Sequence, residues 1–479
     1  MLDSQIKNCF IAPDNQNREQ VEIIFDNIIK QILNYLCNAD NFPPYPPLKI
    51  FAASDFSIPE AGFSLSQIQN NLALLFQHSM NPSSSKYIGH MDSISNIYAI
   101  LGEMIAAAIN NNMLSLEMSP FLTQLEYALI REFCDLFGLP RTSGGVITSG
   151  GSLANLQALV VARNETLKLN NGNLTNLRQT PVILCSEIAH ASVAKAAMLI
   201  GIGSENVIKI TVNSNFQMDV LDLKQKVMEY FTTEYIPIAI VATAGTTVTG
   251  SIDNLSEIAA IAKEHNIWLH IDAIYGGALV FGGERRHLLN GIEFADSISF
   301  NPQKWLYVAK TSSMVLFRNF SSMVSNFRIT APYMKEQEDF INLGEITIQG
   351  SHNAEILKLW LSLLAIGKDG YHQLIEYGYV LTNICLTEIK HCDYLQLVME
   401  PQTNICCFKI KLTNYEDDFI NSKLHDYLLQ NGFFVSLPRF QGQLCLRMVL
   451  LNPFSSKNVI KSCFSLIDKF YNQHHVKGN

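Results

Sequence analysis

The chain has 479 residues, of which 48% are hydrophobic and 16% are charged. This length exceeds what one simple core accommodates and predicts two or three packed lobes. The formal net charge is −9 and no long run of Lys or Arg occurs, which argues against a nucleic-acid partner. No apolar stretch reaches about 18 residues, so we expect no membrane span.

The cysteines and the first residues bear on the compartment. Ten cysteines are scattered along the chain without a CxxC pair, which is typical of buried thiols in a reducing environment. The N-terminal sequence MLDSQIKNCF lacks the basic start and apolar run of a signal peptide. These features predict a cytoplasmic protein.

In chain order, residues 1–85 are expected to form a mainly helical segment, and residues 86–370 a large α/β domain. Within the large domain, short β-branched runs alternate with helical patterns. The runs are 181–185, 207–211, 238–243, 267–271, 297–300 and 313–317. This alternation predicts a mainly parallel sheet covered by helices on both faces.

Residues 371–479 are expected to form a smaller α+β domain. Predicted strands and helices are mixed there, with strands at 405–412, 433–438 and 443–451 and helices at 419–430 and 458–471.

Polar residues follow several predicted strands, where ligands of open α/β sheets bind. Gly150, Gly151 and Ser152 lead directly into a helix, whose free amides and positive end would hold a phosphate. The alternative is a glycine-rich helix start without a ligand. His190 follows strand 181–185 and would stack on a planar cofactor or titrate, the alternative being a structural histidine. Thr246 follows strand 238–243, in a loop that suits a flat ligand or is a plain tight turn.

Two charged residues complete the series. Asp272 closes an apolar strand, where an ionised carboxylate is costly unless it is paired. A protonated pyridine nitrogen would be such a partner, whereas a metal or an internal salt bridge are alternatives. Lys304 follows strand 297–300 beside Pro302 and Trp305, so desolvation would lower the pKa of its amine and let it form an imine. The alternative for Lys304 is an ordinary surface charge.

The order of these groups favours one cofactor over the separate alternatives. A phosphate-binding loop, a ring-stacking histidine, a carboxylate for a ring nitrogen and an amine for an aldehyde follow one another, each at a predicted strand end. Those are the contacts that pyridoxal 5′-phosphate requires.

Three segments resemble the group II pyridoxal-phosphate-dependent amino acid decarboxylases, which include the aromatic amino acid, tyrosine, glutamate and diaminobutyrate decarboxylases. The segments are TSGGSLANL (148–156), HIDAIYGG (270–277) and RHLLNGIEFADSISFNPQKW (286–305). The likeness covers about residues 87–367 and continues more loosely to the C-terminus. It implies the aspartate-aminotransferase-like fold (fold type I), with a seven-stranded sheet. It also implies a homodimer with both active sites at the interface.

The resemblance also implies roles for individual residues. Lys304 would carry the cofactor as a Schiff base, Asp272 would pair with the pyridine nitrogen and His190 would stack on the ring. Tyr333 would return a proton to the substrate carbon. The remaining cofactor contacts would come from Gly151, Ser152, Thr246, Asn301 and Gln303. The implied reaction converts an L-amino acid to its amine and carbon dioxide by way of an external aldimine and a quinonoid.

The chain departs from the family pattern at three positions. Gln303 replaces a histidine that helps to hold the phosphate, and Ile274 replaces an alanine that packs under the ring. His352 stands where some members have an arginine that binds the substrate carboxylate, so it is the candidate substrate-binding residue. These departures leave two rivals open. One is an aldehyde synthase or carbon–carbon lyase on the same scaffold, and the other is a homologue that binds the cofactor without turnover.

Overall fold

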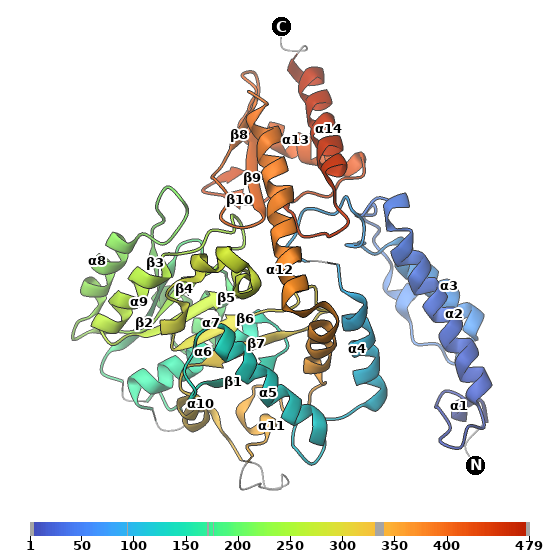
Figure 1. The fold of residues 1–479 in the computed structure, drawn as a ribbon, viewed down its shortest axis with the longest axis horizontal. Coiled ribbons are helices and arrows are strands. Elements are labelled where there is room, and N and C mark those ends of the chain that lie inside the picture. Colours follow the sequence, from blue (N-terminus) through green and yellow to red (C-terminus); the bar gives the residue numbers. More distant parts are fainter. Residues whose placement is uncertain (1–3, 93, 170–171, 176, 331–339, 476–479) are drawn as a thin grey trace.

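A computed structural model describes residues 4–92, 94–169, 172–175, 177–330 and 340–475. Its centre is a seven-stranded sheet in the order β1-β7-β6-β5-β4-β2-β3, in which only β7 runs antiparallel to its neighbours. The strands are β1 (Gly144–Thr148), β2 (Thr180–Ser186), β3 (Val207–Ile210), β4 (Tyr235–Thr243), β5 (Trp268–Ala273), β6 (Ser297–Phe300) and β7 (Ser313–Phe317). The prediction of a mainly parallel seven-stranded sheet is confirmed (Figure 1).

Helices pack against this sheet because its strands are apolar on both faces. Nearly every side chain of β2, β4, β5, β6 and β7 is buried. Helix α6 (Gly151–Leu167) crosses the sheet in contact with β1, β4, β5, β6 and β7. The other helices of this region are α5 (Pro120–Leu136), α7 (Ser192–Leu199), α8 (Val220–Tyr230), α9 (Leu255–Glu264), α10 (Phe320–Phe327) and α11 (Leu343–Ile346).

A second hydrophobic core lies in the C-terminal part of the chain. There β8 (Leu395–Leu397), β9 (Ile405–Ile410) and β12 (Leu446–Val449) form an antiparallel sheet in the order β12-β9-β8. Helices α13 (Asp417–Gln430) and α14 (Lys457–His475) pack beside it, and β10 (Arg439–Phe440) pairs with β11 (Gln443–Leu444). The strand predicted over 433–438 is wrong, since Phe434 and Ser436 form only isolated bridges.

One long helix connects the two cores. Helix α12 (Glu355–Lys390) begins against the large sheet and ends in the C-terminal core, and its backbone kinks at Gly367, where φ is 67°. Gly367 adopts this left-handed conformation without strain because it lacks a side chain. The boundary expected between residues 370 and 371 falls inside this helix, just after the kink.

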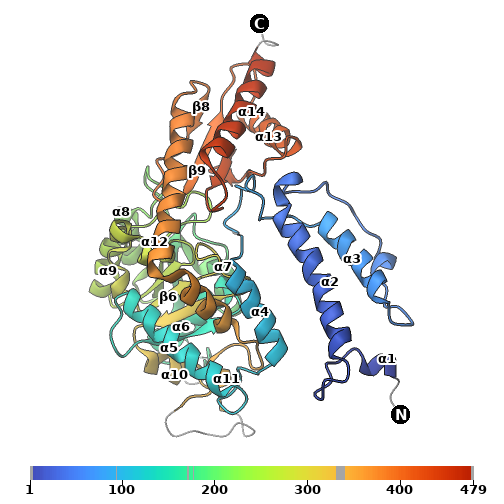
Figure 2. The same cartoon turned by 45° about the vertical axis from the view of Figure 1, so that its right-hand side comes forward.

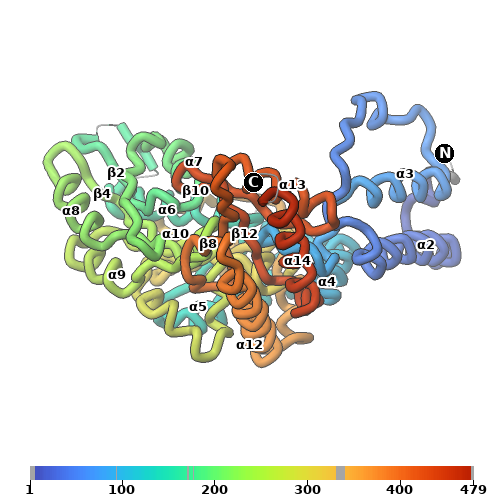
Figure 3. Tube along the Cα trace, turned by 90° about the horizontal axis from the view of Figure 1, so that it is seen from above, coloured from blue at the N-terminus to red at the C-terminus, as the bar shows by residue number. Residues whose placement is uncertain are grey.

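The N-terminal helices stand away from the rest of the chain. Helices α1 (Ser4–Lys7), α2 (Arg18–Cys37) and α3 (Leu65–Gln77) lie to one side of the body in both side views and from above (Figures 2 and 3). Neither α2 nor α3 has a buried residue. Helix α4 (Ile97–Ile109) returns to the body and packs on α12. In the described part of the chain, every helix is too short or too polar to cross a membrane.

Candidate active site

The carboxyl ends of β4, β5 and β6 meet at one edge of the sheet and enclose a cavity of about 220 Å³. Asp272 is paired in register with Thr243 of β4 and with Ser299 of β6. The cavity brings together most of the residues that the sequence singled out, namely Gly151, Ser152, His190, Asp272, Asn301, Gln303 and Lys304.

Asp272 lies at the inner end of the cavity as a buried carboxylate. Its Oδ2 accepts a hydrogen bond from Asn155 Nδ2 at 2.9 Å, and its Oδ1 accepts one from the Ile274 amide at 3.1 Å. Burial raises the pKa of Asp272, while these two donors act in the opposite direction. Among the described residues no ion pair includes Asp272, so a cation bound in the cavity would supply the charge that this carboxylate lacks.

Lys304 lies in the loop after β6, where its amide donates to the carbonyl of Asn301. Burial lowers the pKa of the Lys304 amine, and the carboxylate of Asp92 partly offsets this effect. The Nζ of Lys304 lies 3.9 Å from Asp92 Oδ1, and Lys310 binds the same oxygen at 2.7 Å. Removal from water favours the free, nucleophilic form of the amine, whereas the nearby carboxylate favours the ammonium form.

His190 is held in one orientation by the first turn of α7. Its Nδ1 accepts from the Ser192 amide at 3.2 Å and lies 2.8 Å from the Ser192 hydroxyl. Because an amide only donates, Nδ1 is the unprotonated nitrogen of the neutral ring and Nε2 carries the hydrogen. His190 is exposed in the single chain, unlike Asp272.

The start of helix α6 forms another wall of the cavity. Gly150 precedes the helix, and Gly151 and Ser152 are its first residues. The first amides of a helix have no acceptor within the helix and face its positive end, so this wall suits an anion. Across the cavity, Gln303 Oε1 accepts from the Ser312 amide at 2.8 Å, which leaves the NH2 group as the end of Gln303 that donates.

Thr243 provides an observation that itself points to a ligand. Its hydroxyl is buried, lines the cavity and has no hydrogen-bond partner among the described residues. Native structures rarely leave a buried hydroxyl unpaired, because the lost hydrogen bond costs about 1–3 kcal/mol. The cavity thus presents an anion-binding helix start, an amine, a buried acid and an unused hydroxyl, and these groups match the polar parts of pyridoxal phosphate.

Two of the expected site residues lie elsewhere, and a third falls outside the described residues. Thr246 is buried beside the cavity, and its hydroxyl bonds to the hydroxyls of Thr249 and Ser251. His352 is not part of the lining; its carbonyl accepts from the Met113 amide. Tyr333 lies outside the described residues.

The cavity also contains residues that the sequence analysis did not single out, namely Met91, Asn155, Ser192, Thr243, Gly245, Thr247 and Tyr275. Asn155 carried a usable signal, since it follows Gly151 by four residues and the helical period places both on one face. Beside the cavity, buried Arg447 donates to the carbonyls of Gly89 and Thr247, so this side of the site is positively charged.

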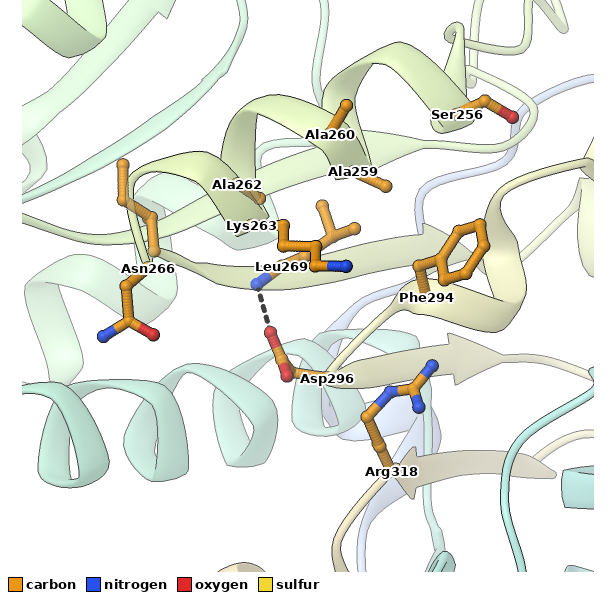
Figure 4. A pocket seen from close by; sticks show the side chains of 11 residues that line it. Ser256, Ala259, Ala260, Ala262, Lys263, Asn266, Leu269, Phe294, Asp296 and Arg318 are labelled. Carbon is orange, nitrogen blue, oxygen red and sulfur yellow. Dashed lines mark hydrogen bonds between the residues drawn. The ribbon is translucent and has the colours of Figure 1, made fainter.

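A larger cavity, of about 520 Å³, lies at the opposite end of β5. Figure 4 shows Asp296 accepting the Leu269 amide there, at 2.8 Å, with Arg318 nearby. Arg318 is bound to the carbonyls of Ala295 and Glu293. Asp296 thus connects the segment before β6 to β5, and Arg318, which follows β7, binds the same segment.

Comparisons with known proteins agree with this geometry. Residues 49–411 match the model of the pyridoxal-dependent decarboxylase conserved domain. The chain is 27% identical to an L-2,4-diaminobutyrate decarboxylase of Acinetobacter baumannii, over 98% of this chain and 96% of that protein. It is 31% identical to an L-aspartate decarboxylase of Metarhizium robertsii, over 76% and 74%. The structure of an Oryza sativa TDC with PLP and tryptamine superposes with a TM-score of 0.91 at 22% identity, covering 97% of this chain and 99% of that one.

Proposed function

Because this chain belongs to the pyridoxal-dependent decarboxylase family and decarboxylates an amino acid with pyridoxal 5′-phosphate, we propose that the cavity at the ends of β4, β5 and β6 is its active site. The observation that carries this proposal is that a desolvated amine, Lys304, and a buried acid, Asp272, line the same cavity. When bound, the cofactor supplies an aldehyde that reacts with amines and a cationic ring that accepts the electron pair released when carbon dioxide leaves.

We assign the protein groups to the parts of this cofactor as follows. Lys304 binds the aldehyde, and Asp272 keeps the ring nitrogen protonated. His190 lies against the ring. The first amides of α6, with Gly151 and Ser152, hold the phosphate together with Asn301 and the NH2 group of Gln303. Thr246 acts from behind the cavity, through the hydroxyl cluster that holds the loop carrying Thr247.

Proton transfers are assigned to two residues. The Lys304 amine lies 3.9 Å from the carboxylate of Asp92, which would hold it as a cation whenever it is not bonded to the cofactor. We assign the return of a proton to the substrate carbon to Tyr333, on the basis of the family resemblance alone. His352, also assigned by resemblance alone, would take part in substrate binding from outside the described cavity.

For the substrate we propose an L-amino acid with a short polar side chain. The relatives described above are named for diaminobutyrate and aspartate, both of which have such side chains. Mass spectrometry of the amines formed from a mixed amino acid pool identifies the substrate. Release of carbon dioxide with an equal yield of amine is expected, whereas hydrogen peroxide and aldehyde would indicate an aldehyde synthase.

We also propose a homodimer in the cytoplasm. What supports a second copy is the apolar surface of α4, where Ile97, Tyr98 and Ile109 are 70%, 49% and 47% exposed. Exposed apolar patches of this kind are typical of protein interfaces. The cytoplasmic assignment rests on the free cysteines, which occur throughout the described chain.

The test compares Lys304→Ala with Lys263→Ala, which removes the same ammonium group from the cavity at the opposite end of β5. Lys304→Ala is expected to abolish both the absorption of the lysine-bound cofactor and amine formation, and Lys263→Ala is expected to retain both. Full activity of the Lys304→Ala variant would contradict the assignment of the site.

A further inference from the structure

The side chain of Asn155 uses its whole hydrogen-bonding capacity inside the protein. Its Nδ2 donates to Asp272 Oδ2 and to Ser192 Oγ, both at 2.9 Å. Its Oδ1 accepts from the Ser299 hydroxyl at 2.6 Å and lies 3.1 Å from His270 Nε2. An amide group has two hydrogens and two lone pairs to offer, and all four are occupied. Asn155 is 1% exposed, so water does not compete for these bonds.

The direction of every bond in this network follows from two fixed ends. An ionised Asp272 only accepts, so the amide must turn its NH2 group toward Asp272 and its oxygen toward His270. That oxygen only accepts, so His270 carries its hydrogen on Nε2. Burial lowers the pKa of His270 to about 4, so the ring is neutral and Nδ1 accepts.

The other end of the network is the indole of Trp268, which only donates. Its Nε1 donates to Ser297 Oγ at 2.8 Å, and Ser297 Oγ lies 2.9 Å from His270 Nδ1. The hydroxyl hydrogen of Ser297 therefore points to His270. The bonds thus run in one direction, from Trp268 through Ser297, His270 and Asn155 to Asp272.

A second branch leaves Asn155 through Ser192. The Ser192 hydroxyl accepts from Asn155, so its own hydrogen is directed to His190 Nδ1. The same amide group thereby fixes the acid at the inner end of the cavity and the histidine at its wall.

We propose that Asn155 is a positioning residue that sets the orientation of Asp272 toward the ring nitrogen and, through the Ser192 hydroxyl, supports the tautomer of His190 that the Ser192 amide selects. This inference rests on the proposed function, because it concerns the same cavity. Two described donors bond to the Asp272 carboxylate, and without Asn155 only the Ile274 amide remains. A buried carboxyl with fewer donors takes up a proton more readily, and a neutral acid no longer stabilises a cationic ring.

The test measures binding to apoprotein of two probes, pyridoxal 5′-phosphate and its analogue in which C–H replaces the ring nitrogen. Asn155→Leu has a similar shape but no donor, and it is expected to bind pyridoxal phosphate about 10- to 100-fold more weakly, the usual loss for a hydrogen bond to a charged group. Its affinity for the analogue, which has no ring nitrogen to pair with Asp272, is expected to stay unchanged.

Two further variants complete the experiment. Gln157→Leu removes another buried amide from the same helix, one that donates to the Ile346 carbonyl, and it is expected to leave both affinities unchanged. Asn155→Thr restores a single donor and is expected to fall between wild type and Asn155→Leu, and it decides the matter if Asn155→Leu does not fold. The effect must also appear in the pH dependence of the bound cofactor's absorption, which a purely structural role would not shift.

Unchanged affinity for pyridoxal phosphate in both Asn155 variants, or an equal loss for the two probes, would overturn the role of Asn155 and leave the proposed function intact. A wild-type protein that takes up neither probe would instead overturn the proposed function, and this inference with it.

Discussion

Gly151 and Ile274 face each other across the wall of the cavity, so that a Cβ atom built on Gly151 would lie 2.5 Å from Ile274 Cδ1. Real Cβ atoms do not approach other carbons this closely, so the absence of a side chain at 151 makes room for the larger one at 274. This contact gives a physical reason why the cavity wall accommodates Ile274: the glycine at 151 leaves room for its side chain.

The first prediction follows from this contact. Gly151→Ala should push Ile274 toward the cofactor and weaken cofactor binding roughly 5- to 100-fold, the range that about 1–3 kcal/mol of overpacking corresponds to. Ile274→Ala in the same chain should restore most of the affinity. Titration of the four apoproteins with pyridoxal phosphate measures this double-mutant cycle. Additive losses in the double variant would show that the two positions are independent.

The second prediction concerns the charges around Lys304. Asp92 raises the pKa of the Lys304 amine and Lys310 lowers it. Cofactor uptake requires the free amine, so its rate should rise with pH through this pKa. Asp92→Asn should move the midpoint of that profile to lower pH, and Lys310→Ala should move it to higher pH. Stopped-flow measurement of the cofactor uptake rate between about pH 6 and pH 10 tests this prediction. Midpoints that move in the same direction in both variants would refute it.

The third prediction concerns Glu126, a fully buried carboxyl on α5 whose Oε1 accepts the Ile147 amide at 2.9 Å. Burial raises the pKa of Glu126 from 4.5 to about 7. Between these two values the folded chain keeps a proton that the unfolded chain releases, so the free energy of unfolding falls as pH rises through this window. At about 1.4 kcal/mol per pH unit, the fall is at most about 3 kcal/mol.

Glu126→Gln keeps the acceptor and removes the titration. Its free energy of unfolding should therefore change less than that of the wild type between about pH 5 and about pH 7.5. Urea denaturation of the two apoproteins across this range measures the difference. Parallel pH profiles for the two proteins would mean that Glu126 does not titrate in this range.

The fourth prediction separates decarboxylation from its rival on the same scaffold. Tyr333→Phe removes the hydroxyl assigned to proton return. The variant should therefore form less amine and more aldehyde, with hydrogen peroxide produced from dissolved oxygen. Product ratios from the wild type and the variant decide this. An unchanged amine yield would remove Tyr333 from the mechanism.

The sequence located most of the large sheet, because six of its strands are short runs rich in β-branched and other apolar residues. Strand β1 was missed, since GGVIT begins with two glycines and has only two β-branched apolar residues. The segment 433–438 was misassigned, because its apolar residues pack into the C-terminal core without forming a ladder.

The candidate site followed from local motifs, but its supporting network did not. Asn155 meets His270 and Ser299 across 115 and 144 residues of sequence. No local pattern encodes such pairs, because they depend on how α6 crosses the sheet. Arg447 was overlooked for a similar reason: a single arginine in an apolar strand gives no sign of the loops that it contacts.

The isolation of helices α2 and α3 has a thermodynamic consequence. The segment between and around them exposes Leu48, Ile50 and Ile58 at 83%, 89% and 95% of their surface. A segment without an interior of its own gains its free energy of folding from whatever covers it, and that gain obeys mass action. Dilution should therefore loosen α2 and α3 before it affects the sheet, and the melting temperature should rise with protein concentration.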